Sequence, residues 1–222
     1  MTLVFDPAEH PAGVCQGVLS QLITPRPIAM ISTVDVDGVV NVAPFSYYMP
    51  VTGHPMLLAV TMGLRESDGG LKHTYENARR TGDFVVNVTT SRLREHIETV
   101  AIEFPRGVSE LDSVPWTTMP SQRVTSPSIA ESPAHLECRI HREVPLGEPG
   151  VPASEVHLVV AEVVCVTLDE SICTADYRID QTAMATVGRM GFPWFTTATP
   201  ESMMVIPRYT YEEFLDQRAA SS

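Results

Sequence analysis

The stretch TPRPIAMISTVDVDGVVNVAPFS, residues 24–46, decides how the chain begins to fold. Residues 28–34 are rich in β-branched and apolar side chains over the length of a typical strand. Asp37 and Gly38 form a strong hairpin signal, and the segment VVNVAPF follows them directly. The residues that precede the two prolines avoid the helical region, so the approach to the first strand is expected to be extended. The stretch therefore predicts two antiparallel strands joined by a tight turn.

The outgoing strand has an unusual composition. The segment NVAPFSYYMP, residues 41–50, places Asn41, Pro44 and Ser46 where a sheet interior is normally apolar, and two tyrosines follow. Two interpretations are open at this point. The small and polar groups form the wall of a binding site, or the strand frays into a loop.

The rest of the chain predicts a mainly β protein. Further strands are predicted at residues 56–62, 84–90, 134–144 and 156–168, and helices at residues 12–22, 74–81, 91–102 and 211–217. The strands are joined mostly by short turns and do not alternate with helices, which favours an antiparallel barrel or sandwich of Greek-key type with peripheral helices. No segment has the composition of an interdomain linker, so residues 1–222 are predicted to form one domain.

Two long stretches are predicted to be irregular. Residues 103–132 are dotted with proline and serine, with Trp116 and Met119 as expected anchors to the body. An irregular stretch of this length is more often functional or partner-binding than idle. Residues 187–195, VGRMGFPWF, are predicted to form a loop.

Composition narrows the classes of partner. The chain has 222 residues, of which 44% are apolar, and a formal net charge of -12 with a pI near 4.9. Such a surface repels phosphate backbones and anionic membranes, so neither nucleic acid nor a membrane is an expected partner. The first residues do not resemble an export signal, and the four cysteines form no C-x-x-C pair. A cytoplasmic location with reduced thiols is the expectation.

Familiar catalytic motifs are absent from the sequence. It contains no G-x-S-x-G, H-E-x-x-H or P-loop, and no G-x-G-x-x-G after a strand. His135 and His141 share one face of a predicted strand, but six residues of strand separate them by roughly 20 Å. One zinc ion cannot bridge that distance with bonds of about 2 Å. We therefore interpret this face as a solvated outer surface, and no metal site is predicted.

Three side chains gather around the predicted start of the helix at residues 74–81. Arg65 and Lys72 supply positive charge, and Thr74 supplies a hydroxyl. A helix N-terminus with added cations is a natural seat for a phosphate. The alternative is an exposed polar loop with Thr74 as an ordinary N-cap.

Two further places carry candidate residues. His157 opens a strongly apolar strand, where a histidine acts either as a hydrogen-bonded residue at the edge of the core or as a catalyst. Arg189 lies in the loop that also contains Trp194 and Phe195. These rings either pin the loop to the core or stack on a planar ligand.

Together these segments resemble a known family. TPRPIAMISTVDVDGVVNVAPFS is similar to the opening motif of the flavin reductase-like proteins, the FMN-binding split β-barrel group. GLRESDGGLKHTYENARRTGDFVVNV, SPAHLECRI, VHLVVAEVVCV and VGRMG resemble later blocks of that family, in the same order. The resemblance covers the chain from about Phe5 to Phe195.

The resemblance implies a homodimer of split barrels that binds FMN, with FAD as the alternative flavin, near the subunit interface. By resemblance, the residues that line the flavin lie along the outgoing strand, and cations and hydroxyls bind the FMN phosphate. Two further residues are expected to lie near the isoalloxazine ring or the approaching nicotinamide. The implied flavin-lining residues are Asn41, Ala43, Pro44, Phe45, Ser46 and Tyr47; the implied phosphate-end residues are Arg65, Lys72 and Thr74, assisted by Ser32 and Thr33; and His157 and Arg189 lie near the ring.

Two positions depart from the pattern of the family. His73 stands where the family usually has aspartate, which indicates a phosphate end that is built differently. The segment GRMGFPWF lacks the second glycine of the usual pattern, and Phe192 and Pro193 are expected to reshape access to the flavin.

The resemblance leads to three hypotheses on function. In the first, the protein is an NAD(P)H-dependent flavin reductase that takes hydride from NADH or NADPH and passes electrons to an acceptor or to a partner flavin-dependent monooxygenase. His157 is the catalytic candidate, through a hydrogen bond near the reactive edge of the flavin. In the second, it is an FMN-binding electron-transfer flavoprotein without free-flavin turnover. In the third, it is a flavin-free barrel that acts as an interaction module.

Overall fold

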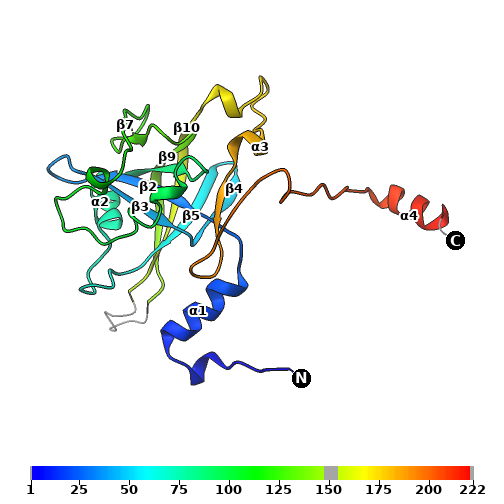
Figure 1. Cartoon of the computed structure of the whole chain (residues 1–222), viewed down its shortest axis with the longest axis horizontal. Helices are drawn as coiled ribbons and strands as arrows, with labels where there is room; N and C mark the ends of the chain where they lie inside the picture. The colour runs from blue at the N-terminus through cyan, green and yellow to red at the C-terminus, as the bar shows by residue number, and fades with distance from the viewer. Residues whose placement is uncertain (1, 148–154, 221–222) are drawn as a thin grey trace.

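A seven-stranded antiparallel sheet forms the body of the protein. The computed structural model describes residues 2–147 and 155–220. The order of strands in the sheet is β3-β2-β6-β9-β10-β5-β4. Its members are β2 (Ala29–Val34), β3 (Val40–Phe45), β4 (Tyr48–Gly53), β5 (Met56–Met62), β6 (Asp83–Val88), β9 (Ala134–Pro145) and β10 (His157–Leu168). Figure 1 shows these strands curling around one another at the centre of the molecule.

The chain itself shows why the sheet must close. Strands β3 and β4 lie at opposite ends of the strand order, yet only Ser46 and Tyr47 separate them in sequence. Three residue steps span roughly 10 Å at most, so the two edges of the sheet must meet there. The sheet therefore forms a split barrel with the β3–β4 junction at its seam, and the mainly β antiparallel prediction is confirmed.

The opening hairpin has the predicted form. Residue Thr33 pairs with Asn41, and Val34 pairs with Val40. In the turn, Gly38 adopts a φ of +84°, and the Asp35 carboxylate accepts hydrogen bonds from the backbone N–H groups of Asp37 and Val39. Strand β4 was missed by the sequence prediction. The residues after Ser46 do not fray into a loop; instead they begin the opposite edge of the sheet.

Two apolar clusters lie on the two faces of the sheet. The barrel interior is filled from β2, β5, β6, β9, β10 and helix α2 (His73–Thr81) by a set that includes Ile31, Val60, Met62, Tyr75, Phe84 and Val159. The outer face of β2 and β3 is covered by a second set that includes Met30, Val42, Leu93, Ile97, Trp116 and Ile129. Burial of these side chains at about 25 cal/mol per Å² is the main stabilising contribution.

The remaining elements are short. The helices are α1 (Ala12–Leu22), α2, α3 (Gln181–Met184) and α4 (Tyr211–Ala220); the 3-10 turns are η1 (Pro7–Glu9), η2 (Arg94–His96), η3 (Glu110–Ser113) and η5 (Glu170–Ile172); and the minor strands are β1 (Arg26–Pro27), β7 (Thr118–Met119), β8 (Ser128–Ile129), β11 (Val187–Arg189) and β12 (Phe195–Thr197). The segment predicted as a loop at residues 187–195 is a hairpin, because β11 pairs with both β12 and β1.

Two helix predictions need correction. Residues 91–102 do not form one helix. They form a series of tight turns around η2, in which Leu93 N–H donates to Thr90 C=O and His96 N–H donates to Leu93 C=O. Helix α2 has Lys72 as its N-cap, so Thr74 lies inside the first turn rather than capping it.

The segment 103–132 covers the chain's own sheet. Buried Glu137 accepts hydrogen bonds from the N–H groups of Gln122 and Arg123 at 2.7 and 2.6 Å. Because this segment lies over the start of β9, Glu137 and His135 are buried, and the prediction of a solvated face is wrong for them. Trp116 is a buried anchor as predicted, whereas Met119 is exposed.

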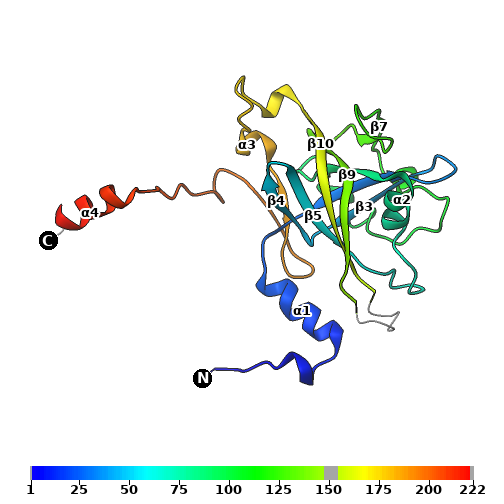
Figure 2. The same cartoon turned by 180° about the vertical axis from the view of Figure 1, so that it is seen from behind.

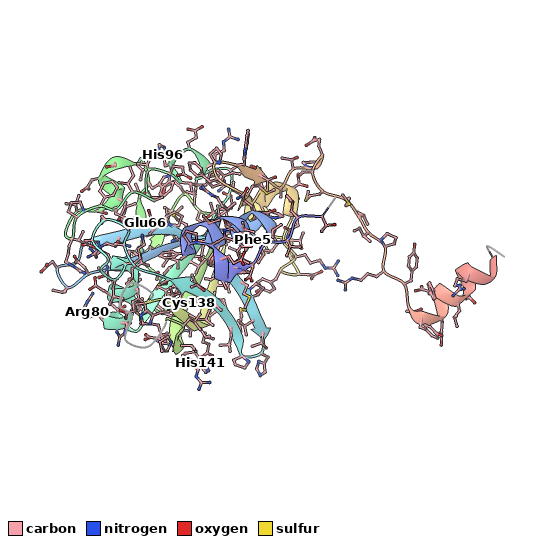
Figure 3. The ribbon with its side chains drawn as sticks, turned by 90° about the horizontal axis from the view of Figure 1, so that it is seen from below. Phe5, Glu66, Arg80, His96, Cys138 and His141 are labelled. Atoms are coloured by element: carbon pink, nitrogen blue, oxygen red, sulfur yellow. The ribbon has the colours of Figure 1, made fainter. Side chains whose placement is uncertain are left out.

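Both ends of the chain extend from the barrel. Figures 1 and 2 show α1 below the body and α4 at the end of a long C-terminal arm. Figure 3 shows the same arm reaching away from the body when the molecule is viewed from below. Along the arm, Val205 is almost fully exposed and Ile206 and Tyr211 are largely exposed. Among the described residues, no helix combines the length and the apolar character needed to span a bilayer.

Candidate functional site

Strand β3 presents candidate residues on both of its faces. Successive side chains of a strand alternate between faces, so Asn41, Ala43 and Phe45 share one side and Val42 and Pro44 share the other. Phe45 packs against the interior cluster, whereas Val42 belongs to the outer cluster. The residues expected along the flavin are thus divided between the barrel side and the outer side of an edge strand.

The structure brings the predicted phosphate-end residues together at one end of β3. Asn41 Nδ2 donates to Thr74 Oγ1 at 2.8 Å, which joins the strand to the first turn of α2. The loop before α2 carries Arg65, whose Nη1 donates to Leu71 C=O at 2.8 Å. Lys72 is the N-cap of the same helix. These residues therefore form one compact cluster. The two interpretations of it, a phosphate site or an exposed polar loop with an ordinary N-cap, apply to the same group of side chains.

The cations of this cluster already face carboxylates. Arg65 forms a two-point ion pair with Asp68, at 3.0 Å from Nε and 2.8 Å from Nη2. Lys72 Nζ lies 2.5 Å from Glu103 Oε1. Positive charge here is balanced inside the chain, so a phosphate must compete with or join these carboxylates.

Glu103 occupies a set of donors suited to an anion. Its two oxygens accept hydrogen bonds from the N–H groups of Glu66 and Ser67, both at 2.9 Å, as well as the bond from Lys72. Burial alone would raise the pKa of Glu103, but the hydrogen bonds from Lys72, Ser67 and Glu66 outweigh it and lower the pKa to about 2. The loop thus holds an anion strongly.

Ser32 and Thr33 are both fully buried. Ser32 Oγ donates to Pro127 C=O at 2.5 Å, beneath the covering segment. Thr33 Oγ1 accepts from Asn77 Nδ2 of α2 at 3.3 Å. Thr33 therefore lies next to the cluster at α2, whereas Ser32 lies on the opposite face of β2.

His157 is enclosed by partners from its own chain. Its Nδ1 lies 2.8 Å from Tyr75 Oη and its Nε2 lies 2.9 Å from Glu155 Oε1. The imidazole stacks on the Tyr75 ring with centroids 4.3 Å apart. Burial, and then the nearby Glu143, raise the pKa of Tyr75 to about 12, which keeps its hydroxyl protonated. Catalysis by His157 stays a prediction that must account for these partners.

A cavity of about 290 Å³ lies at the other end of β3. Pro44, Ser46 and Tyr47 line it from the β3–β4 junction, and Arg189 lines it from the end of β11. Arg189 forms an ion pair with Glu98, and its guanidinium lies 4.3 Å from the centroid of Phe195. The structure therefore brings Arg189 to the junction residues, five residue steps or roughly 17 Å along the strand from Asn41.

Arg26 was not among the predicted site residues, yet it lines the same cavity. This side chain is 8% exposed, and its Nε donates to Ser46 Oγ at 3.3 Å. The signal available in the sequence was a single arginine between two prolines at the start of the first strand.

Glu110 was also missed. It lies on η3 behind β3, where its Oε2 accepts from Val42 N–H at 2.8 Å, and Ser109 Oγ donates to Val40 C=O at 2.6 Å. These two side chains take the place of a neighbouring strand along the open edge of the sheet. Burial raises the pKa of Glu110 to about 7, only partly offset by the hydrogen bond from Val42.

Comparison with known proteins identifies the class to which this protein belongs. The family model for the flavin reductase like domain matches residues 21–184. This range contains β2 to β10, the cluster at α2 and the β3–β4 junction. The chain belongs to the flavin reductase-like family.

The chain is also similar to individual proteins. The uncharacterized protein YwrF of Bacillus subtilis is 33% identical over 160 residues, which cover 72% of this chain and 76% of YwrF. The structure of nitrilotriacetate monooxygenase component B from Bacillus cereus has a TM-score of 0.84 and 25% identity, over 92% of this chain and 99% of that one. Flavoredoxin of Desulfovibrio vulgaris has a TM-score of 0.70 at 18% identity, over 86% of this chain and 94% of that one, and so shows the fold alone.

Proposed function

We propose that this protein binds FMN and acts as an NAD(P)H-dependent flavin reductase. The observation that carries the proposal is the arrangement along β3, with an anion-holding cluster near Asn41 at one end and a cavity at Ser46 and Tyr47 at the other. A ligand with a phosphate at one end and a flat ring at the other has this layout. Membership of the flavin reductase-like family supports the same conclusion.

The donors present fit an FMN phosphate. Lys72 Nζ and the N–H groups of Glu66 and Ser67 already hold the Glu103 carboxylate, so their geometry suits an anion. We infer that Lys72, with Arg65 and Thr74, binds the phosphate, and that Glu103 is displaced or shifts to admit it.

The β3–β4 junction fits the ring. Ala43 and Ser46 are small enough to allow close approach of a flat group, while Pro44 and Phe45 provide apolar contact. Tyr47 Oη is buried, and among the described residues it has no hydrogen-bond partner. A ring edge with an acceptor atom would complete it.

The chemistry then belongs to the bound flavin, which accepts hydride from a nicotinamide; the protein binds, orients and excludes water. No residue is required as a general acid or base. In this proposal Arg189 supplies positive charge at the cavity, balanced by Glu98 at its rim. His157, held by Tyr75 and Glu155, is the candidate catalytic residue.

We propose further that the protein is a homodimer. The C-terminal arm and α1 expose many apolar side chains, among them Leu22, Met204, Val205, Ile206 and Phe214. Isolated exposure of one such residue is ordinary, but a continuous exposed stretch marks an interaction surface. A second copy of the chain is the occupant that the resemblance implies.

The test of the function is reduction of bound flavin. Purified protein is loaded with FMN, separated from free flavin and mixed anaerobically with NADH or with NADPH. The proposed reductase bleaches its flavin band with at least one nicotinamide and turns over added flavin. A protein that retains FMN but oxidises neither nicotinamide is instead an electron-transfer flavoprotein with another reductant.

A further inference from the structure

The loop that leads into α2 contains a site that suits an anion, and a side chain of the same protein fills it. The backbone N–H groups of Glu66 and Ser67 donate to the two oxygens of Glu103, both at 2.9 Å, and Lys72 Nζ lies 2.5 Å from Glu103 Oε1. Successive N–H groups beside a cation form a concavity of the kind that binds phosphate. We call these three donors the anion site. Glu103 therefore occupies the place that an external anion would take.

Glu103 reaches the anion site from a loop that is anchored elsewhere. Residues 101–108, which form this loop, are mostly exposed. Before the loop, Val100 is buried in the outer apolar cluster, and after it Ser109 Oγ donates to Val40 C=O at 2.6 Å. Because neither anchor involves the anion site, the loop can move at Glu103 while both of its ends stay in place.

The ion pairs that connect this loop to α2 are partly open to water. Lys72 pairs with Glu103, and Arg106 pairs with Glu76. The exposed fractions of these four side chains lie between 19% and 50%. Ion pairs that water reaches contribute little to the stability of the fold, because solvent screens them. Separation of Glu103 from Lys72 is therefore not expected to disturb the barrel.

An FMN phosphate needs the same three donors. At neutral pH a phosphate monoester carries close to two negative charges and three acceptor oxygens, whereas a carboxylate has one charge and two oxygens. Burial raises the pKa of Glu103, but the hydrogen bonds from Lys72, Ser67 and Glu66 outweigh this effect and lower it to about 2, so Glu103 remains charged at neutral pH. The net affinity for the phosphate is then the difference between its own interaction with the anion site and that of Glu103.

We propose that Glu103 is an internal competitor for the FMN phosphate and keeps the flavin exchangeable. It leaves the anion site when FMN binds and returns as FMN departs, which lowers the affinity for FMN and accelerates its release. This inference rests on the proposed function and extends it. FMN is then a flavin that enters and leaves this chain, rather than a permanently bound prosthetic group.

The experiment compares the full native chain with Glu103→Gln, which keeps a carbonyl oxygen as an acceptor and removes the charge. We expect the variant to bind FMN about 10- to 100-fold more tightly, mainly through slower release, because the charged competitor is gone. Riboflavin, which lacks the phosphate, should bind equally to both chains. Glu95→Gln, the same change of charge at an exposed position, should leave FMN binding unchanged. Fluorescence titration gives the affinities, and the recovery of flavin fluorescence on stopped-flow dilution gives the release rates.

Inorganic phosphate tests the anion site without the flavin. At constant ionic strength, phosphate should raise the melting temperature of Glu103→Gln more than that of the native chain, and chloride should not. The same melting curves show whether the variant is folded. If it is not, Glu103→Asp provides the comparison, because its shorter carboxylate keeps the charge but reaches the three donors less well. It should bind FMN several-fold more tightly than the native chain.

Equal or weaker FMN binding by the folded variant would overturn the inference and leave the proposed reductase intact, because Glu103 would then order the loop rather than compete. An equal gain in affinity for riboflavin would also overturn it. Failure of both chains to bind FMN would reject the proposed function, and the phosphate measurement would then decide. Greater stabilisation of the variant by phosphate supports the internal competitor, and equal stabilisation overturns it.

Discussion

Asn41 on the edge strand β3 donates a 2.8 Å hydrogen bond to Thr74 in the first turn of α2. This bond joins the opening hairpin to the helix that follows the loop in which Glu66 and Ser67 hold the Glu103 carboxylate. The strand then runs to Ser46 and Tyr47 at the seam of the barrel. One strand therefore connects both halves of the proposed flavin site, and changes at its two ends should have separable effects.

Replacement of Lys72 should weaken binding of the phosphate specifically. Lys72→Gln removes a charge-assisted donor worth about 1.5–3 kcal/mol, so we expect FMN affinity to fall by about 10- to 100-fold. Riboflavin, which lacks the phosphate, should bind unchanged. Fluorescence titration with both flavins measures this, with Arg94→Gln as the control for loss of one positive charge at an exposed position. Parallel losses for FMN and riboflavin would contradict a phosphate role.

Glu110 should make the free energy of unfolding decrease as the pH rises. Its pKa is raised from 4.5 to about 7 in the folded state, so the unfolded state loses the proton first as the pH rises. Glu110 therefore costs nothing below about pH 4.5, lowers stability progressively from there to about pH 7, and carries its full cost above that. The cost is roughly 3 kcal/mol at most.

Glu110→Gln keeps a carbonyl that can accept from Val42 N–H and removes the charge. Denaturant unfolding at pH 5 and pH 8 should show the variant gaining stability relative to the native chain at pH 8, with little difference at pH 5. A variant that is less stable at pH 8 would show that the carboxylate is favourably held.

The exposed apolar arm should be required for dimer formation. Val205 and Ile206 are 95% and 75% exposed in the single chain, so a partner must cover them if the homodimer forms through the arm. We expect sedimentation velocity to give twice the chain mass of 24.3 kDa for the native protein. Val205→Asp with Ile206→Asp should raise the dimer dissociation constant at least tenfold, while Glu212→Gln should leave it unchanged. A native monomer would refute the proposal.

His157 should affect reduction more than binding. His157→Ala removes the ring that stacks on Tyr75 and its contact with Glu155, while Tyr75 keeps its bond to Glu143 at 3.1 Å. In stopped-flow measurements on the FMN-loaded variant, the rate of flavin reduction should fall by a larger factor than the affinity for FMN. If the reduction rate and the FMN affinity fell by the same factor, His157 would have a structural role only.

Local sequence signals were sufficient for much of the fold. The Asp37-Gly38 turn and the apolar run of β5 are encoded by neighbouring residues. The hairpin around the turn and strand β5 both formed where predicted. Strand β4 was missed because Pro50 and Gly53 are poor strand formers. It is an edge strand that forms only because the closing barrel provides β5 as a partner.

The site was less predictable, for a physical reason. Arg65, Lys72 and Thr74 are close in sequence, so their clustering could be read from the chain. Glu103 joins Lys72 from 31 residues away, and Arg26 meets Met190 from 164 residues away. The pairing of Lys72 with a carboxylate and, among the described residues, the burial of Arg26 without one depend on such distant contacts. Composition and local spacing do not predict them.

We propose above all that this chain binds flavin and reduces it with a nicotinamide. The most direct test is the visible absorption spectrum of the FMN-incubated protein, recorded before and after anaerobic addition of NADH or NADPH. We expect a bound-flavin band that bleaches with at least one of the two nicotinamides. A protein that acquires no flavin band after incubation with FMN would contradict it, and the family resemblance would then extend to the fold but not to the function.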